Sequence, residues 1–162
     1  MADQPGMGLT RPRDLAIAAL VGGVAGWLLV RSIEAAAGQP PQLPWVGPLV
    51  LWFVAALVAG LAWTTWRRIQ VRRERIEPER AVTFLAFGKA SGIGGAAIAG
   101  GYLVFALLAI GHLDAEGPQQ RLVRGLVAAV AGVAIGAAGL WLERACRVPD
   151  PPEGEDEAAR EA

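Results

Sequence analysis

The chain has 162 residues, of which 54% are hydrophobic and 19% charged, and its mean hydropathy is +0.39. A soluble domain spreads its charges along helix faces to keep water on its outside, whereas here they gather in short clusters between long apolar runs. This segregation excludes an ordinary soluble domain and predicts an all-α, polytopic membrane protein.

Charge and cysteine content exclude further classes. The 15 basic residues balance 15 acidic ones, so no net field draws the whole molecule to nucleic acid, and we expect no nucleic-acid partner. The balance hides an asymmetry, because a basic middle is offset by an acidic C-terminal segment. Cys146 is the single cysteine, which excludes an intrachain disulfide and a metal site built from several thiolates.

Apolar runs long enough to cross a membrane recur along the chain, since a hydrocarbon core needs about 20 helical residues. The first run is entered through Thr10, an expected N-cap, with Pro12 in the first turn. Closely spaced prolines at 40–44 end it, because a proline cannot continue a helix. The predicted spans are residues 15–33, 46–65, 88–111 and 122–142, which together predict a bundle of four transmembrane helices.

The segments outside the spans divide the chain into three parts. We expect a flexible tail at 1–10, a transmembrane domain at 11–147 and a disordered acidic tail at 148–162. A basic start, an apolar run and a group of alanines also imitate a signal peptide. However, Arg31 and Glu34 separate the apolar run from the alanines, so we expect the first span to be retained.

Basic residues indicate how the spans are oriented. They precede the first span, crowd the 67–80 connection and follow the fourth span, while the connection between the first two spans carries no charge from Ala35 to Val46. Loops rich in Lys and Arg stay in the cytoplasm, so both termini and the 67–80 connection should be cytoplasmic in a multi-pass protein of the cell membrane. Arg121 and Arg124 are exceptions on the outer side and are outnumbered.

The positions of the tryptophans agree with the predicted spans, because their amphipathic rings favour the headgroup region at the ends of a span. Trp45 is expected at the outer boundary of the second span. Trp63, Trp66 and Trp141 are expected at the inner boundary.

Small residues repeat along the spans at helical spacing. Residues four apart share a helix face, and a face without bulky side chains lets a neighbouring backbone approach closely. Such ladders pack either the helices of one chain or the copies of a homo-oligomer, and both remain open. The candidate packing residues are Gly22 and Gly26 in the first span, Gly88, Gly92, Ala96 and Gly100 in the third, and Ala128, Gly132 and Gly136 in the fourth.

Lys89 is the one ionisable residue that could lie within a span. A buried ammonium group would mark a substrate or proton path, but starting the third hydrocarbon segment just after Lys89 lets it snorkel to phosphates at the inner boundary. Arg31 and Glu34 are expected to form an ion pair near the outer end of the first span. The basic connection is expected to contact anionic lipid headgroups, through residues that include Arg67, Arg68, Arg72 and Arg73.

Nothing in the sequence indicates a catalytic or cofactor site. Residues 92–97 fit the dinucleotide pattern G-x-G-x-x-A, but they lie inside an apolar helical run with no strand before them, which that fingerprint needs. His112 is the single histidine, and no span carries a carboxylate pair on one face. We therefore expect no enzyme activity, no cofactor and no metal ion.

The four spans, the glycine-rich third span with Lys89 and the C-terminal motif carry a family resemblance. The chain resembles the actinobacterial membrane proteins of domain of unknown function family 3180, over about Gly8 to Pro149. These proteins are often encoded beside folate-biosynthesis genes, but the family has no established activity and therefore implies no functional residues. The motif is Leu140-Trp141-Leu142-Glu143-Arg144-Ala145-Cys146-Arg147-Val148-Pro149.

The sequence favours a scaffold or accessory subunit that acts through helix packing and its basic cytoplasmic face. The alternative is a small transporter or permease component that works as an oligomer and uses Lys89, together with Arg31, in its path. The expected partners are the bilayer, anionic lipid headgroups, and either a second copy of the chain or an unidentified membrane protein.

Overall fold

The computed structural model describes residues 10–38, 41, 43–67, 78–110 and 116–145. The regular secondary structure in these ranges is helical, and they contain no strand. By length and composition each helix has a segment that could cross a membrane, which confirms the all-α, polytopic fold. The helices are α1 (Pro12–Ala37), α2 (Val46–Trp66), α3 (Pro78–Leu107) and α4 (Glu116–Ala145).

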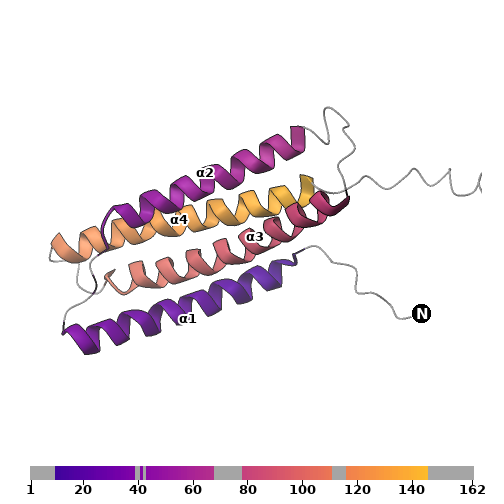
Figure 1. Cartoon of the computed structure of the whole chain (residues 1–162). Helices are drawn as coiled ribbons and strands as arrows, with labels where there is room; N and C mark the ends of the chain where they lie inside the picture. Colours follow the sequence, from indigo (N-terminus) through magenta and orange to yellow (C-terminus); the bar gives the residue numbers. More distant parts are fainter. Residues whose placement is uncertain (1–9, 39–40, 42, 68–77, 111–115, 146–162) are drawn as a thin grey trace, which may run out of the picture.

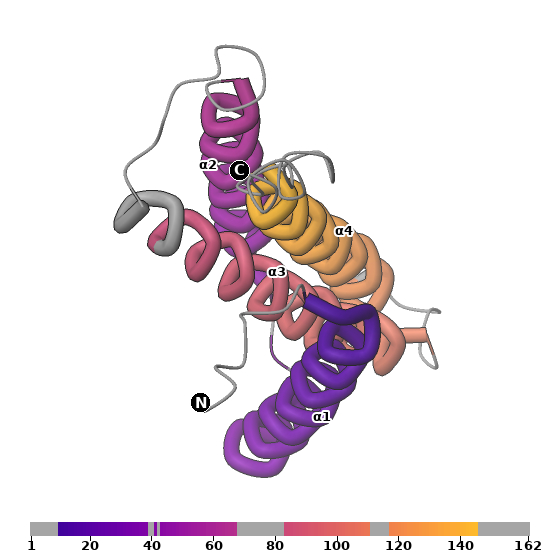
Figure 2. The backbone as a smooth tube through the Cα atoms, turned by 90° about the vertical axis from the view of Figure 1, so that its right-hand side faces the viewer, coloured from indigo at the N-terminus to yellow at the C-terminus, as the bar shows by residue number. Residues whose placement is uncertain are grey.

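The helices lie side by side in the order α1, α3, α4, α2, which differs from their order in the sequence (Figure 1). α3 and α4 form the most extensive contact, α1 packs mainly on α3, and α2 packs mainly on α4. Because successive helices run in opposite directions, the pair α3–α4 is antiparallel while α1–α3 and α2–α4 are parallel (Figures 1 and 2). We call the end where α1 begins and α4 ends the tail end, and the opposite end the hairpin end.

The start of α1 corrects one expectation. Arg11, not Thr10, is the N-cap residue, with φ −81° and ψ 148°, and Pro12 opens the helix. The backbone N–H of Arg11 donates to the carboxylate of Asp14 at 3.2 Å, and that negative charge in the first turn complements the helix dipole. Thr10 instead donates two hydrogen bonds to Glu143 of α4.

α1 ends at a left-handed residue. Gly38 has φ 65°, a conformation that a side chain disfavours, and its N–H donates to the carbonyl of Glu34 at 2.9 Å. The prolines that follow could not have continued the helix.

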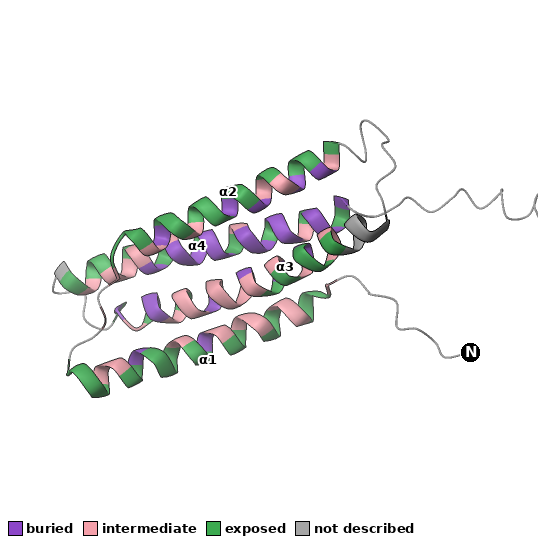
Figure 3. Ribbon diagram, viewed as in Figure 1, coloured by how far each residue is buried: buried purple, intermediate pink, exposed green. Residues whose placement is uncertain are grey.

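Burial is concentrated in α4. In its apolar segment 56% of the residues are buried, against 11% in α1, so α4 is central and α1 is peripheral (Figure 3). The core consists mostly of alanine and other small residues, while large apolar side chains such as Leu20 and Val46 face outward, 70% and 65% exposed. This distribution suits a lipid environment, in which apolar side chains cover the outside and small residues allow helices to approach each other.

Three of the predicted spans, 15–33, 46–65 and 122–142, lie within α1, α2 and α4. The third, 88–111, starts inside α3 and runs past its end at Leu107. Other expectations fall outside the described residues: the tail before Thr10, the acidic tail at 148–162, and Arg68, Arg72 and Arg73 of the basic connection.

Candidate functional site

Glycines form the contact between α3 and α4. A Cβ atom on Gly88 would lie 2.9 Å from the carbonyl oxygen of Gly139, and one on Gly139 would lie 2.6 Å from the backbone nitrogen of Gly92. Both distances are shorter than a real Cβ contact, so the two backbones approach as closely as they do because no side chain separates them. Gly95 meets Gly136 and Gly132 meets Ala99 in the same way farther along the contact.

A second contact of this kind joins α1 to α3. A Cβ on Gly26 would lie 2.9 Å from the carbonyl oxygen of Gly101. Nearer the tail end, a Cβ on Gly22 would overlap the backbone of Ala97, and one on Gly100 that of Ala19. α1 is therefore attached to α3 through the two glycines of its own predicted ladder.

The predicted ladder on α3 is divided between these two contacts. Gly88 and Gly92 face α4, whereas Gly100 faces α1. An α-helix turns about 100° per residue, so twelve residues carry the ladder about 120° around the axis. Ala96 lies between the two directions, and its backbone nitrogen would be 3.7 Å from a Cβ on Gly136. On α4, Ala128 is fully buried and Gly132 and Gly136 face α3.

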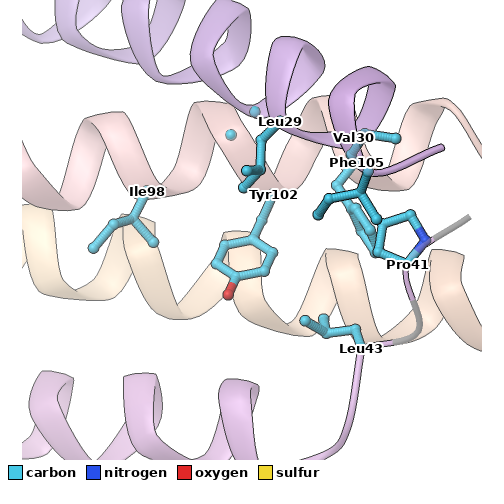
Figure 4. A pocket seen from close by; sticks show the side chains of 10 residues that line it. Leu29, Val30, Pro41, Leu43, Ile98, Tyr102 and Phe105 are labelled. Atoms are coloured by element: carbon cyan, nitrogen blue, oxygen red, sulfur yellow. The ribbon is translucent and has the colours of Figure 1, made fainter. Parts of the chain in front are cut away.

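An apolar cavity of about 380 Å³ lies toward the hairpin end, bounded by α1, α3 and the connection after α1 (Figure 4). Tyr102 contributes the polar group of its lining, and its ring extends toward the start of α2, where a Cβ on Gly47 would lie 4.0 Å from the hydroxyl. The volume is at the lower end of the range for small-molecule sites. The side chains that line it include Leu29, Val30, Ile33, Pro41, Leu43, Ile98, Tyr102 and Phe105.

Two arginines of α4 contact the lining of this cavity. The guanidinium carbon of Arg121 lies 5.1 Å from the centre of the Phe105 ring. Arg124 donates to the backbone carbonyl of Leu43 at 2.8 Å, and its guanidinium carbon lies 5.4 Å from the centre of the Trp45 ring. These are the two arginines that the charge count treated as exceptions, and here each packs against an aromatic ring.

The guanidinium groups are incompletely satisfied. Arg124 also donates to the side-chain oxygen of Gln120 at 2.8 Å. The Nε atoms of Arg121 and Arg124 are buried and have no hydrogen-bond partner among the described residues. Among the described residues, the two guanidinium groups contact neutral groups: aromatic rings, a backbone carbonyl and an amide oxygen. The hairpin end thus combines an apolar volume with two cations.

Glu143 is a buried carboxylate at the tail end that sequence reasoning did not select. Its residue is 2% exposed, and its two carboxylate oxygens accept hydrogen bonds from the backbone N–H and the hydroxyl of Thr10, at 2.9 and 2.7 Å. A signal for it exists in the sequence, because Glu143 follows Gly136 by seven residues and therefore lies on the same face of α4. That face packs on α3, where a Cβ on Gly88 would lie 3.0 Å from the Glu143 backbone nitrogen.

The remaining candidate residues are dispersed. Lys89 is partly exposed on α3 and does not line the cavity. Arg31 forms the expected ion pair with Glu34, at 3.3 Å on the surface of α1. Arg67 is exposed at the end of α2. The structure therefore does not bring Lys89, Arg31 and Arg67 together into one site.

Three tryptophans meet near the tail end. The Trp63 ring centre lies 5.7 Å from that of Trp66 and 5.9 Å from that of Trp141, which joins α2 to α4. Trp45 is 47% exposed immediately before α2, at the hairpin end. Aromatic side chains thus occur near both ends of the helices, where the membrane–water interfaces would lie.

Within the described ranges, no three His, Cys, Asp or Glu side chains are grouped so that they could hold a metal ion. The fold and its contacts define a polytopic helical membrane protein in which glycines join α1 to α3 and α3 to α4. The chain belongs to the family described as protein of unknown function DUF3180, whose profile matches residues 15–150. No curated protein and no solved structure matches the chain.

Proposed function

We propose that the chain is a non-enzymatic scaffold or accessory subunit of the cell membrane. The observation that carries this proposal is that the helices pack through small residues and leave large apolar side chains uncovered on the outside. The glycine contacts hold α1, α3 and α4 together, while the outward faces of α1 and α2 keep large apolar side chains uncovered, such as Leu20, Leu49 and Phe53. These faces suit lipid or the helices of another membrane protein.

Orientation and lipid contact complete the proposal. With the tail end in the cytoplasm, Arg67 and the rest of the basic connection face anionic headgroups, at about 1 kcal/mol per basic residue. Lys89, partly exposed on α3, would snorkel to the same headgroups. The actinobacterial source and the neighbouring folate genes are expectations from the family resemblance alone.

A photo-crosslinking experiment tests the scaffold. A photoreactive amino acid at Leu20 or at Leu49, each about two-thirds exposed (70% and 63%), should give a discrete protein adduct in native membranes. The chain without the photoreactive label, irradiated in the same way, is the control and should give none. Adducts to lipid alone from both exposed positions would contradict the scaffold proposal.

Lys89→Met separates the scaffold from a transporter. We expect this variant to keep the wild-type adducts and a stability within about 1 kcal/mol of wild type, because Lys89 is partly exposed. A variant that assembles normally but fails to complement a deletion strain would favour the transporter, since a cation that lies in a transport path is required for transport.

A further inference from the structure

We propose that the hairpin-end cavity binds an anionic phospholipid of the surrounding bilayer, with an acyl chain in the cavity and the phosphate at Arg121 and Arg124. This proposal does not depend on the scaffold function or on which side of the membrane the hairpin end occupies.

The cavity has the chemistry of an acyl-chain site. Its walls are aliphatic and aromatic side chains from α1, α3 and the connection after α1, with the Tyr102 hydroxyl as the polar group. An apolar cavity in a protein surrounded by lipid is filled most readily by lipid, because water would find almost no hydrogen-bond partner there. Leu29 lines the cavity and is itself 63% exposed, so the cavity adjoins the outer surface of α1 through which a chain can enter.

The arginines supply the charge that selects the headgroup. Both guanidinium groups are partly buried, and their described contacts compensate no charge. Partial burial of a cation near a membrane is costly without an anion, and a phosphate accepts hydrogen bonds from a guanidinium in the paired geometry that stabilises both groups. Arg121 and Arg124 are each partly exposed, so a phosphate at the surface can reach them.

Cavity and charge are joined by shared residues. Arg121 packs on the ring of Phe105, which lines the cavity, and Arg124 holds the carbonyl of Leu43, which also lines it. One phospholipid can therefore reach both the guanidinium groups and the cavity. Trp45, beside Arg124 at the start of α2, places this cluster at the depth that aromatic residues favour at the membrane interface.

Lipid retention tests the site. The full chain is reconstituted in bilayers of equal phosphatidylglycerol and phosphatidylcholine, extracted in mild detergent, and its retained lipids are counted by native mass spectrometry. We expect the wild type to retain phosphatidylglycerol preferentially. In Arg121→Gln/Arg124→Gln, the ratio of retained phosphatidylglycerol to phosphatidylcholine should fall about tenfold. Arg121→Lys should keep part of it, because the charge remains while the paired geometry is lost.

Two further variants make the result specific. Arg31→Gln removes the same charge at the hairpin end of α1, from a side chain that does not line the cavity, and should leave the preference unchanged. Leu29→Trp enlarges a side chain that lines the cavity and is 63% exposed, and it should lower the retention of lipid by the folded protein.

Since Arg124 also holds the connection after α1, Arg121→Gln alone is the variant that leaves that contact intact. Its preference for phosphatidylglycerol should fall, while its thermal unfolding temperature should equal that of the wild type. Equal losses in Arg31→Gln and Arg121→Gln would overturn the proposal in favour of a general surface charge. An unchanged preference in the double variant would also overturn it.

Discussion

Glu143 and Thr10 lie 133 residues apart in the sequence, and their hydrogen bonds join the start of α1 to the end of α4. A carboxylate at this depth of burial needs donors, because leaving it without partners would cost several kcal/mol. Thr10 provides a backbone and a side-chain donor to the two oxygens of one carboxylate. The pair therefore fixes the peripheral helix to the central one at the tail end.

We predict that Thr10→Val lowers the free energy of unfolding by about 1.5–3 kcal/mol, the value of a hydrogen bond to a charged group. Valine keeps the shape of threonine and removes the hydroxyl that donates to Glu143 at 2.7 Å. Thermal unfolding of the purified protein in detergent measures the effect. Thr10→Ser is the control that restores the donor, and a loss of the same size in both variants would contradict a role for the hydroxyl.

Residue-level prediction succeeded where the signal is local. The ion pair of Arg31 and Glu34 follows from their spacing on one helix, and it is present. Thr10 was expected to cap α1 for an equally local reason, and that expectation is wrong because α1 begins at Pro12, which makes Arg11 the N-cap and leaves the Thr10 hydroxyl to donate to Glu143. No local pattern predicts a partner so distant in the sequence.

At the scale of the helix, the contact of α3 with α4 depends on glycines that have no substitute. A Cβ on Gly95 would overlap the backbone of Gly136, whereas a Cβ on its neighbour Gly94 would meet nothing within 4 Å. Adjacent glycines on one helix therefore have opposite environments. Backbone atoms cannot move aside as a flexible side chain can, so the crowding at Gly95 must separate the helices.

We predict opposite signs for alanine at these two positions. Gly94→Ala should be neutral or stabilise the fold by up to about 1 kcal/mol, because alanine is the better helix former. Gly95→Ala should destabilise it by about 1–3 kcal/mol, since the overpacking outweighs the gain in helix propensity. Unfolding in a denaturing detergent, followed by circular dichroism, distinguishes the two. A stabilised Gly95→Ala would contradict the close approach of α3 and α4.

Sequence predicted that small residues gather on α3, but not which neighbour each one meets. The ladder was read at a fixed spacing of four, and over twelve residues the helix carries it about 120° around its axis. Gly100 consequently contacts α1 while Gly88 contacts α4. The spacing of Gly92, Gly95 and Ala99, which alternates three and four, is the pattern that follows one face.

For the whole molecule, the order of the helices could not be read from the sequence. Consecutive helices usually pack together, yet α1 packs mainly on α3 and α2 mainly on α4. In a soluble protein the polar face of a helix would show which side is outside. Here the lipid-facing and the packed faces are both apolar, and the hydrophobic pattern therefore distinguishes them poorly. Length and charge clusters, which do not depend on packing, predicted the number of helices.

The arrangement constrains how the protein can be oriented. The start of α1, the ends of α2 and α4 and the start of α3 all lie at the tail end, so the four must share one side of the membrane (Figure 1). A reporter after Glu77 and one after Ala145 must therefore agree with each other, and one after Gly38 must oppose them. The fold determines which reporters share a side of the membrane. Which of the two sides faces the cytoplasm depends on the distribution of charge.

We predict that alkaline phosphatase, which is active only outside the cytoplasm, is inactive after Glu77 and after Ala145 and active after Gly38. Basic residues before α1, between α2 and α3 and after α4 outnumber Arg121 and Arg124 at the opposite end, which should hold the tail end inside. Replacing Arg67, Arg68, Arg72 and Arg73 with asparagine should weaken this bias and give mixed activity at Glu77. Full activity at Glu77 and Ala145 in the unmodified chain would show that the orientation is the opposite of the predicted one. The fold would be unaffected, because the arrangement of helices fixes only the relative sides of the three positions.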